Sequence, residues 1–248
     1  MWSIVPFKIL ARGKQRLAGM LTERERAALS RAMIEDLLSA LVQVQLLEGI
    51  LMVSDDDGAA HFAQKYGLDL INEDRTPGPG LNNAVNCAIN YLMSSSIHDI
   101  MVIHGDMPLV SAADLSGLIQ GHQRHGKPAL TLVSDRWRKG TNCLISSSRD
   151  AIPACFGKDS LSKHRRAAQQ HGVPCRIAEV PSIMFDIDTP ADLEELARRL
   201  DTLDGSIAVN TRTFLQGIDR GRFHDGTVVA AGHDRENAGR AATGIVLP

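Results

Sequence analysis

The sequence has no excess of basic charge, and this absence argues against one broad class of partner. It contains 27 Lys and Arg against 29 Asp and Glu, which gives a net charge of −2. Proteins that bind the nucleic-acid polyanion usually carry a basic surplus. We therefore expect a small-molecule substrate and no nucleic-acid partner.

Paired cysteine motifs and long apolar runs are also missing. The four cysteines, Cys87, Cys143, Cys155 and Cys175, form no C-x-x-C motif, so we expect reduced thiols with a structural role. Residues 1–6 are apolar but lack the basic start and the length of a signal peptide, and no segment reaches the ~20 apolar residues of a membrane span. These absences predict a cytoplasmic protein with no membrane partner.

The sequence does have a regular alternation of short apolar runs and longer amphipathic stretches. This rhythm is typical of β-α-β units around a mostly parallel sheet, and 248 residues with 44% hydrophobic content suffice for one α/β core. Strands are predicted at residues 3–7, 50–53, 68–71, 99–104, 129–133, 142–146, 175–180 and 183–187. Helices are predicted from a capping box at 22–25 to about residue 47, and at 58–66, 81–94, 112–125, 160–171 and 191–200.

The composition changes near residue 201, where the sequence becomes rich in Gly, Arg and Asp. Brief β-like runs occur at 207–209, 227–230 and 245–247, without a continuous helical stripe. We therefore predict a main domain over residues 1–204 and a partly extended or disordered extension over 205–248.

Acidic residues follow two of the predicted strands. Asp106 comes directly after the apolar run 100–103, and Asp186 and Asp188 precede a predicted helix with Thr189 as its N-cap. Ligands bind at the carboxyl ends of the strands in open α/β sheets, and carboxylate oxygens suit Mg²⁺. The three aspartates therefore predict a magnesium site, although either cluster alone is equally typical of a turn or a helix cap.

A basic loop lies between the first strand and the first helix. Its Lys8, Lys14 and Arg16 have the charge to hold a triphosphate and to offset the charge of a departing pyrophosphate. The other interpretation is an ordinary solvated surface loop, because Lys and Arg belong on surfaces.

Two further loops have the character of ligand-binding segments. Gly80 lets the backbone approach a flat base, and the amide of Asn82 or Asn83 is suited to reading the base edge, although a plain loop before a helix looks the same. Gly157 and Ser160 open another helix, where backbone N–H groups can hold the carboxylate or phosphate of an acid. Simple helix capping by Ser160 is the alternative. His164, one turn further on, shows no metal-ligand spacing and is expected at the surface or behind the site.

Taken in order, these residues resemble the CofC family, called FbiD in actinobacteria. The family comprises guanylyltransferases of coenzyme F(420) biosynthesis. The resemblance spans roughly residues 1–200 and rests on these matching pieces: Val5-Pro6-Phe7-Lys8, Lys14-x-Arg16-Leu17, Gly80-Leu81-Asn82, Gly105-Asp106-x-Pro108, Gly140-Thr141-Asn142, Phe156-Gly157-x-x-Ser160-x-x-x-His164 and Asp186-x-Asp188-Thr189-Pro190. The aspartate motifs are shared with many nucleotidyltransferases. The Gly140-Thr141-Asn142 piece and the piece from Phe156 to His164 are more specific.

The resemblance implies a GT-A-like Rossmannoid nucleotidyltransferase fold, with a mostly parallel sheet flanked by helices. It implies GTP and a phosphorylated three-carbon acid as substrates: 2-phospho-L-lactate, phosphoenolpyruvate or 3-phospho-D-glycerate. It also implies a second transferase that attaches the product to a deazaflavin precursor.

Carried over by motif, the residue roles implied by the resemblance fall into four groups. Metal ligands are Asp106, Asp186 and Asp188; nucleotide contacts are Lys8, Lys14, Arg16, Gly80, Leu81 and Asn82; acid contacts are Thr141, Gly157 and Ser160; and Lys14, Arg16 and Asp106 act on the reaction itself.

The expected reaction is attack of a phosphate oxygen of the acid on the α-phosphorus of GTP. The nucleophile is already anionic, so positioning and charge neutralisation suffice without a general base. The alternatives are a nucleotidyltransferase for a molybdopterin or a sugar phosphate, a glycosyltransferase with an Asp-x-Asp motif, and a nucleotide-binding regulatory protein without catalysis.

Overall fold

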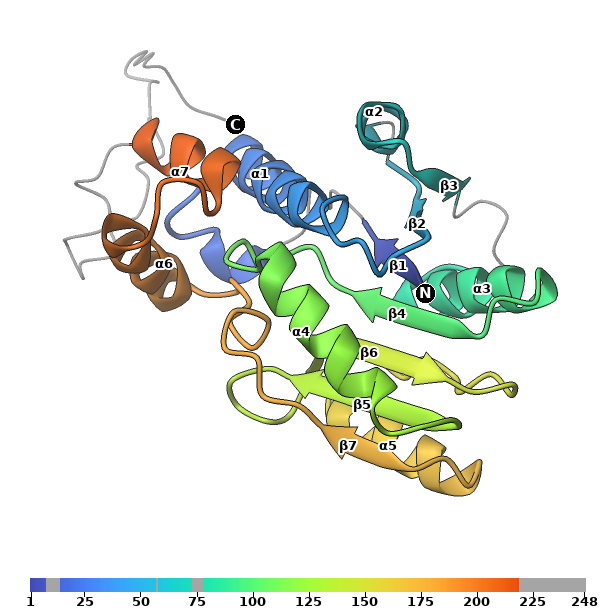
Figure 1. Ribbon diagram of the computed structural model, residues 1–248. Helices are drawn as coiled ribbons and strands as arrows, with labels where there is room; N and C mark the ends of the chain where they lie inside the picture. Colours follow the sequence, from blue (N-terminus) through green and yellow to red (C-terminus); the bar gives the residue numbers. More distant parts are fainter. Residues whose placement is uncertain (8–13, 57, 73–77, 219–248) are drawn as a thin grey trace, which may run out of the picture.

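The fold is a seven-stranded sheet with helices on both faces (Figure 1). The computed structural model describes residues 1–7, 14–56, 58–72 and 78–218. The strands are β1 (Trp2–Pro6), β2 (Gly49–Ser54), β3 (Asp69–Asn72), β4 (Asp99–Ile103), β5 (Ala129–Ser134), β6 (Thr141–Ser147) and β7 (Cys175–Ile177). The helices are η1 (Gln15–Leu17), α1 (Glu23–Leu41), α2 (Gly58–Tyr66), α3 (Leu81–Ser94), α4 (Ala112–Gln123), α5 (Ser160–Gln170), α6 (Pro190–Thr202) and α7 (Val209–Gln216).

The strand order is β3-β2-β1-β4-β6-β5-β7, and β6 alone among these strands runs antiparallel to its neighbours. The predicted mostly parallel α/β architecture is confirmed. The chain crosses from β1 to β2 on one side and returns to place β4 on the other side of β1. This reversal of strand order lies between β1 and β4, and doubly wound sheets bind ligands at the carboxyl ends of the strands at such a position.

Three apolar clusters hold the layers together. One joins α1, α2 and α4 to one face of the sheet, and another joins α3 and α5 to the other face. A third cluster, outside the sheet, packs η1 and α1 against α6 and α7. Fully buried Leu17 anchors η1 in this third cluster, so the end of the basic loop is fixed to the main body.

Local sequence signals explain several element boundaries. Thr22 and Glu25 form the predicted capping box of α1, and Thr189 caps α6 with Pro190 in its first turn, also as predicted. The predicted end of α1 near residue 47 is wrong, because the helix ends at Leu41 and turns follow. Val44 lies in those turns and is only 3% exposed. The sequence therefore shows an apolar residue at helical spacing although the helix has already ended.

The predicted strand at 183–187 does not form, and β7 ends at Ile177 rather than continuing to 180. Ile183, Phe185 and Ile187 are all buried, which accounts for the alternating pattern. The segment begins in a turn, where the N–H groups of Ile183 and Met184 bond to the Val180 carbonyl, and among the described residues it pairs with no strand. Alternating burial therefore did not make it part of the sheet.

The β-like run at 207–209 is also corrected, because helix α7 begins at Val209. Asp36 of α1 accepts hydrogen bonds from the backbone N–H groups of Asn210 (2.8 Å) and Thr211 (2.8 Å) and from the Asn210 amide (2.9 Å). The chain is thus docked on α1 beyond the predicted boundary at 204. That division stays a prediction, and the expected extension beyond residue 218, with its β-like runs at 227–230 and 245–247, lies outside the described residues.

Candidate active site

The candidate site begins where the chain leaves β4. The turn His104-Gly105-Asp106 follows the strand directly, as the sequence predicted. A Cβ atom on Gly105 would lie 2.5 Å from Ile34 Cδ1 of α1, so any larger residue would force the buried Ile34 side chain to shift. The turn that carries Asp106 therefore packs closely against α1.

The Lys14 ammonium lies between two of the predicted carboxylates. Its Nζ atom is 2.8 Å from Asp106 Oδ2 and 2.7 Å from Asp188 Oδ1. The Lys14 side chain is only 12% exposed. Burial alone would lower the pKa of Lys14, but the charges of Asp106 and Asp188 outweigh it and raise the pKa. Two acids from distant parts of the sequence thus converge on one positive charge.

Asp186 completes the acidic cluster, and none of the described basic side chains forms an ion pair with it. The Asn142 amide donates to Asp186 Oδ1 (3.2 Å) and to the Ile183 carbonyl (2.9 Å), and Arg136 donates to the Asp186 carbonyl (3.2 Å). Burial and the neighbouring charges of Asp106 and Asp188 raise the pKa of Asp186 to about 6. The unpaired segment 185–188 is therefore held by side chains rather than by a sheet ladder.

Three hydrogen bonds of the backbone hold residues 187–189, which include Asp188, against the rest of the site. Asp192 accepts from the backbone N–H groups of Asp188 (3.0 Å) and Thr189 (2.8 Å), and Ile187 donates its N–H to the Asp106 carbonyl (3.1 Å). Arg136 in turn binds Asp192 at 2.6 Å. These bonds tie the start of α6 to the turn after β4.

The acidic cluster has the chemistry for a divalent cation. Hard carboxylate oxygens suit Mg²⁺, and a cation beside Asp186 would favour its charged form, which burial and then the charges of Asp106 and Asp188 disfavour. Within the described ranges, no three His, Cys, Asp or Glu side chains already form a metal-holding group. The magnesium role of Asp106, Asp186 and Asp188 therefore stays a prediction.

The predicted basic loop divides into three different situations. Lys8 lies outside the described residues. Lys14 is turned inward onto the acids, which the sequence did not indicate. Arg16 is exposed on η1 and makes no ion pair within the part of the chain that the structure describes, so its guanidinium can meet an anionic ligand.

Asn82 has a different contact from the one predicted. Its amide donates to the Phe156 carbonyl (3.1 Å) and its oxygen accepts from the Phe156 N–H (2.7 Å). Both ends of the side chain therefore hold the loop before α5. Gly80, at φ +108°, and exposed Leu81 open α3 beside it, and base binding by these three residues stays a prediction.

The predicted acid loop presents hydrogen-bond donors before α5. Gly157 takes φ +105°, which favours glycine, while the Ser160 N–H is occupied by the Gly157 carbonyl (3.1 Å). Within the described chain, the N–H groups of residues 157–159 meet no protein acceptor, and neither does the Ser160 hydroxyl. This arrangement can bind an oxygen anion.

Three side chains with clear positioning contacts were not assigned a role from the sequence. Asn142 and Arg136 hold Asp186, and His164 contacts both Thr141 and the loop before α5. Asn142 and His164 belong to the Gly-Thr-Asn and Phe-Gly-x-x-Ser motifs, the more specific pieces of the resemblance. The motifs therefore marked both residues but did not indicate what the side chains do. Nothing in the sequence distinguished Arg136 from other basic residues.

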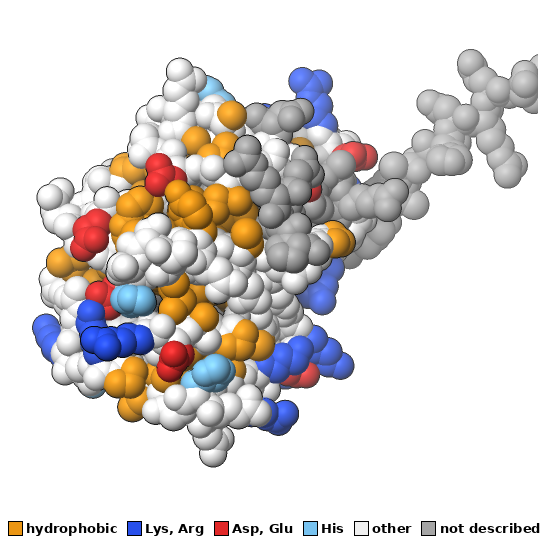
Figure 2. All heavy atoms as spheres, turned by 90° about the vertical axis from the view of Figure 1, so that its right-hand side faces the viewer, with side chains coloured by type: hydrophobic (Ala, Val, Ile, Leu, Met, Phe, Trp, Pro, Cys, Tyr) orange, Lys and Arg blue, Asp and Glu red, His pale blue; other side chains and the backbone are white. Residues whose placement is uncertain are grey.

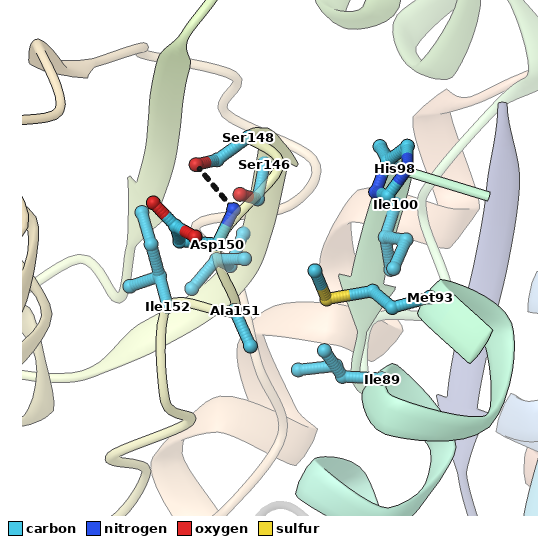
Figure 3. A pocket seen from close by; sticks show the side chains of 10 residues that line it. Ile89, Met93, His98, Ile100, Ser146, Ser148, Asp150, Ala151 and Ile152 are labelled. Atoms are coloured by element: carbon cyan, nitrogen blue, oxygen red, sulfur yellow. Dashed lines mark hydrogen bonds between the residues drawn. The ribbon is translucent and has the colours of Figure 1, made fainter. Parts of the chain in front are cut away.

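The crevice in Figure 3 lies at the amino end of β4, away from Asp106. Ile89, Met93, Ile100 and Ile152 make its walls largely apolar, and His98 borders it. Its cavity volume of about 10 Å³ matches a single water molecule, which excludes a nucleotide. Figure 2 shows the side of the molecule nearest the amino ends of β1 and β4, where the described acidic and basic side chains are interspersed.

Known proteins resemble this chain in both sequence and fold. A family model described as "Guanylyl transferase CofC like" matches residues 1–218. A phosphoenolpyruvate guanylyltransferase from Conexibacter woesei is 33% identical over 219 residues, which cover 88% of this chain and 96% of the relative. A 3-phospho-D-glycerate guanylyltransferase from Colwellia psychrerythraea is 28% identical over 194 residues, which cover 78% of this chain and 90% of that protein.

A solved structure of the nucleotide-diphospho-sugar transferase type, from Desulfovibrio desulfuricans, superposes with a TM-score of 0.66. It is 14% identical and the match covers 87% of this chain and 93% of that one. At this identity the likeness concerns the fold alone.

Proposed function

Because the chain belongs to the CofC-like guanylyl transferase family, we propose that it transfers GMP from GTP to a small phosphorylated acid and releases pyrophosphate. The observation that carries this proposal is the convergence of Asp106 and Asp188 on the Lys14 ammonium. The ring of His104, two residues before Asp106, contacts Phe156 (centroids 4.6 Å apart), directly before residues 157–159, whose N–H groups meet no acceptor among the described residues. A triphosphate and a second anion need these two kinds of subsite side by side.

In the proposed reaction, a phosphate oxygen of the acid attacks the α-phosphorus of GTP. A new P–O bond forms, and the bond from the α-phosphorus to the bridging oxygen of pyrophosphate breaks. The attacking oxygen is already an anion, so no protein base has to remove a proton. The chain's contribution is to align the two substrates and to balance the charge of the five-coordinate phosphorus.

The described residues divide this work. Arg16 and Lys14 supply positive charge for the triphosphate. Among the described residues the two carboxylates take two of the three N–H donors of Lys14, so the third can bind a phosphate oxygen. Thr141, Ser160 and the N–H groups of 157–159 bind the acid. Gly80, Leu81 and Asn82 contact the nucleotide in this proposal, and Asn82 also holds the backbone of Phe156, one residue before Gly157 of the acid site.

Mg²⁺ is part of the proposal, with Asp106, Asp186 and Asp188 as its ligands. Bound there, it would add Lewis-acid charge next to the phosphates. Phosphoenolpyruvate and 3-phospho-D-glycerate are the first acceptors to test, because the relatives carry these names. 2-Phospho-L-lactate is the third.

We also propose a cytoplasmic location, a role in coenzyme F(420) biosynthesis and transfer of the product to a second transferase that acts on the deazaflavin precursor. The labile diphosphate product motivates that last step. For location, the structure adds only that no helix within its described residues is long and apolar enough to cross a membrane.

The test offers the purified chain GTP and Mg²⁺ with each of the three acids, alone and in competition. Pyrophosphate release is measured together with the product masses. We expect release that depends on the acid and a guanosine-diphospho-acid as product. Asp106→Asn should fold normally by circular dichroism and lose activity by about 10²-fold or more. Acid-independent GTP turnover, release of GDP instead of pyrophosphate, or near-normal activity of folded Asp106→Asn would contradict the proposal.

A further inference from the structure

His164 is a fully buried histidine on α5 whose two ring nitrogens both have partners. Its Nε2 atom lies 2.9 Å from the backbone N of Cys155, and its Nδ1 atom lies 3.0 Å from Thr141 Oγ1. The ring is 0% exposed and packs edge-on against Phe156, with ring centroids 4.9 Å apart. One side chain therefore bridges β6 and the loop that opens α5.

The bond to Cys155 decides where the ring proton lies. A backbone N–H can only donate, so Nε2 must accept and carries no proton. Burial and the nearby His104 lower the pKa of His164 to about 4, and the neutral ring then carries its proton on Nδ1. The Ser160 carbonyl, which also interacts with the ring, favours a protonated Nδ1 as well.

This tautomer determines the direction of the next bond. His164 donates from Nδ1, so Thr141 Oγ1 accepts and keeps its own hydroxyl proton for another group. In the described part of the chain, the Thr141 hydroxyl has no other partner. Its proton is therefore available to an acceptor oxygen beside Ser160 and Gly157.

We propose that His164 is a positioning residue that presents the Thr141 hydroxyl as an obligatory donor to an oxygen anion of the phosphorylated acid. The inference rests on the proposed function and assigns a role that the reaction chemistry alone does not require. Through Cys155, the same ring also fixes the loop 155–157, which carries Gly157. His164 thus acts on acid binding without touching the acid.

His122 provides a matched control within the same chain. It is also buried (1% exposed) on a helix, its Nδ1 also contacts a strand threonine, Thr131 (2.8 Å), and burial also lowers its pKa to about 4. Its Nε2 meets Ser147 at 2.8 Å, and the whole group lies between α4 and the sheet. A substitution of His122 therefore shows the general effect of losing a buried histidine bonded to a threonine. Any effect found only in the His164 variant belongs to the role of His164.

The test compares His164→Gln, His164→Asn and His122→Gln. A Gln oxygen reaches the Nε2 position and keeps the Cys155 bond without the Thr141 donor, whereas Asn keeps a donor near the Nδ1 position. We expect His164→Gln to raise the KM for the acid about tenfold, the effect of one hydrogen bond to a charged group, and to leave the KM for GTP within about twofold. His164→Asn keeps the Thr141 donor but gives up the Cys155 bond, so its acid KM should lie between those of the wild type and His164→Gln. His122→Gln should lower the melting temperature with the acid KM unchanged.

A double-mutant cycle sharpens the assignment. Because His164 acts through the Thr141 hydroxyl, His164→Gln should add little to the acid KM once Thr141→Val is present. If the rises in acid KM caused by His164→Gln and Thr141→Val multiply fully in the double variant, the proposal is overturned. It is also overturned by an unchanged acid KM in folded His164→Gln, or by an equal rise of the acid KM in His122→Gln.

Nitrogen NMR of wild-type His164 provides a readout that needs no variant. We expect an Nδ1-protonated neutral ring at neutral pH, and an Nε2-protonated ring would overturn the proposal. Wild-type protein without any acid-dependent pyrophosphate release would refute the proposed function, and the role of His164 with it. An active wild type with a normal acid KM in His164→Gln would refute the role of His164 alone.

Discussion

Asp186→Asn is expected to stabilise the metal-free protein while removing its activity. The folded state raises the pKa of Asp186 from 3.8 to about 6, chiefly by burial and then by the charge of Asp106. The charged carboxylate is thus disfavoured by folding, and stability is lost as the pH rises from about 4 through about 6. Asn cannot ionise, and its oxygen still accepts the Asn142 hydrogen bond, so the variant escapes this loss.

The magnitude follows from the pKa change. A rise of roughly two pKa units corresponds to about 3 kcal/mol at most, at ~1.4 kcal/mol per unit. Asp186 is only partly buried, so solvent screening reduces this to about 1–1.5 kcal/mol. For a domain of this size, such a gain raises the melting temperature by about 2–6 °C.

Urea unfolding in EDTA at pH 7.5 and at pH 4 measures the effect. We expect Asp186→Asn to be the more stable protein at pH 7.5 and to match the wild type at pH 4, where Asp186 is protonated. Asp188→Asn is the matched control, because it removes an acid that pairs with Lys14 and should lower stability at pH 7.5. A variant Asp186→Asn no more stable than the wild type at pH 7.5 would refute the electrostatic reasoning.

The same variant also separates stability from function. Mg²⁺ with GTP should stabilise the wild type by binding the folded state, and should stabilise Asp186→Asn much less. Guanylyl transfer should fall in parallel. Equal stabilisation of both proteins by Mg²⁺ and GTP would remove Asp186 from the proposed metal ligands.

Two further predictions concern contacts between distant segments. Asn82→Ala removes the Asn82 bonds to the Phe156 N–H and carbonyl, so the KM for the acid should rise several-fold although Asn82 is proposed as a nucleotide contact. Steady-state kinetics with each substrate varied in turn measure this effect. An unchanged KM for the acid would contradict the coupling. Asp36→Ala removes three hydrogen bonds to the start of α7 and should lower the free energy of unfolding by about 2–4 kcal/mol, as measured in urea. Proteolysis near residue 203 should become faster. Unchanged stability would show that apolar packing alone holds α7.

Most elements of the fold followed from local sequence. Helices α2 and α3 have the predicted bounds, because Gly and Pro punctuate them and their apolar faces repeat at helical spacing. The failures occurred where a distant partner decides the structure. The segment 183–187 has the side-chain alternation of a strand without a neighbouring strand, and α7 depends on Asp36, 174 residues away from Asn210.

The candidate site was predictable as a set of residue types and not as a set of contacts. The position of Asp106 after a strand followed from sequence, because strand ends and their turns are local features. The pairing of Lys14 with Asp106 and Asp188 was not predictable, since it joins three separate segments. Asn82 was given a base-reading role because its side-chain amide suits one, whereas its observed partner is the backbone of Phe156.

The clamp of Asn82 on Phe156 limits how the protein can be re-engineered. A loop 155–160 taken from a relative with another acceptor preference can be held here only if Asn82 is kept, because two backbone bonds of the loop end on this side chain. Grafts that keep Asn82 should retain the geometry of the loop, whereas the same grafts in an Asn82→Ala background should lose it.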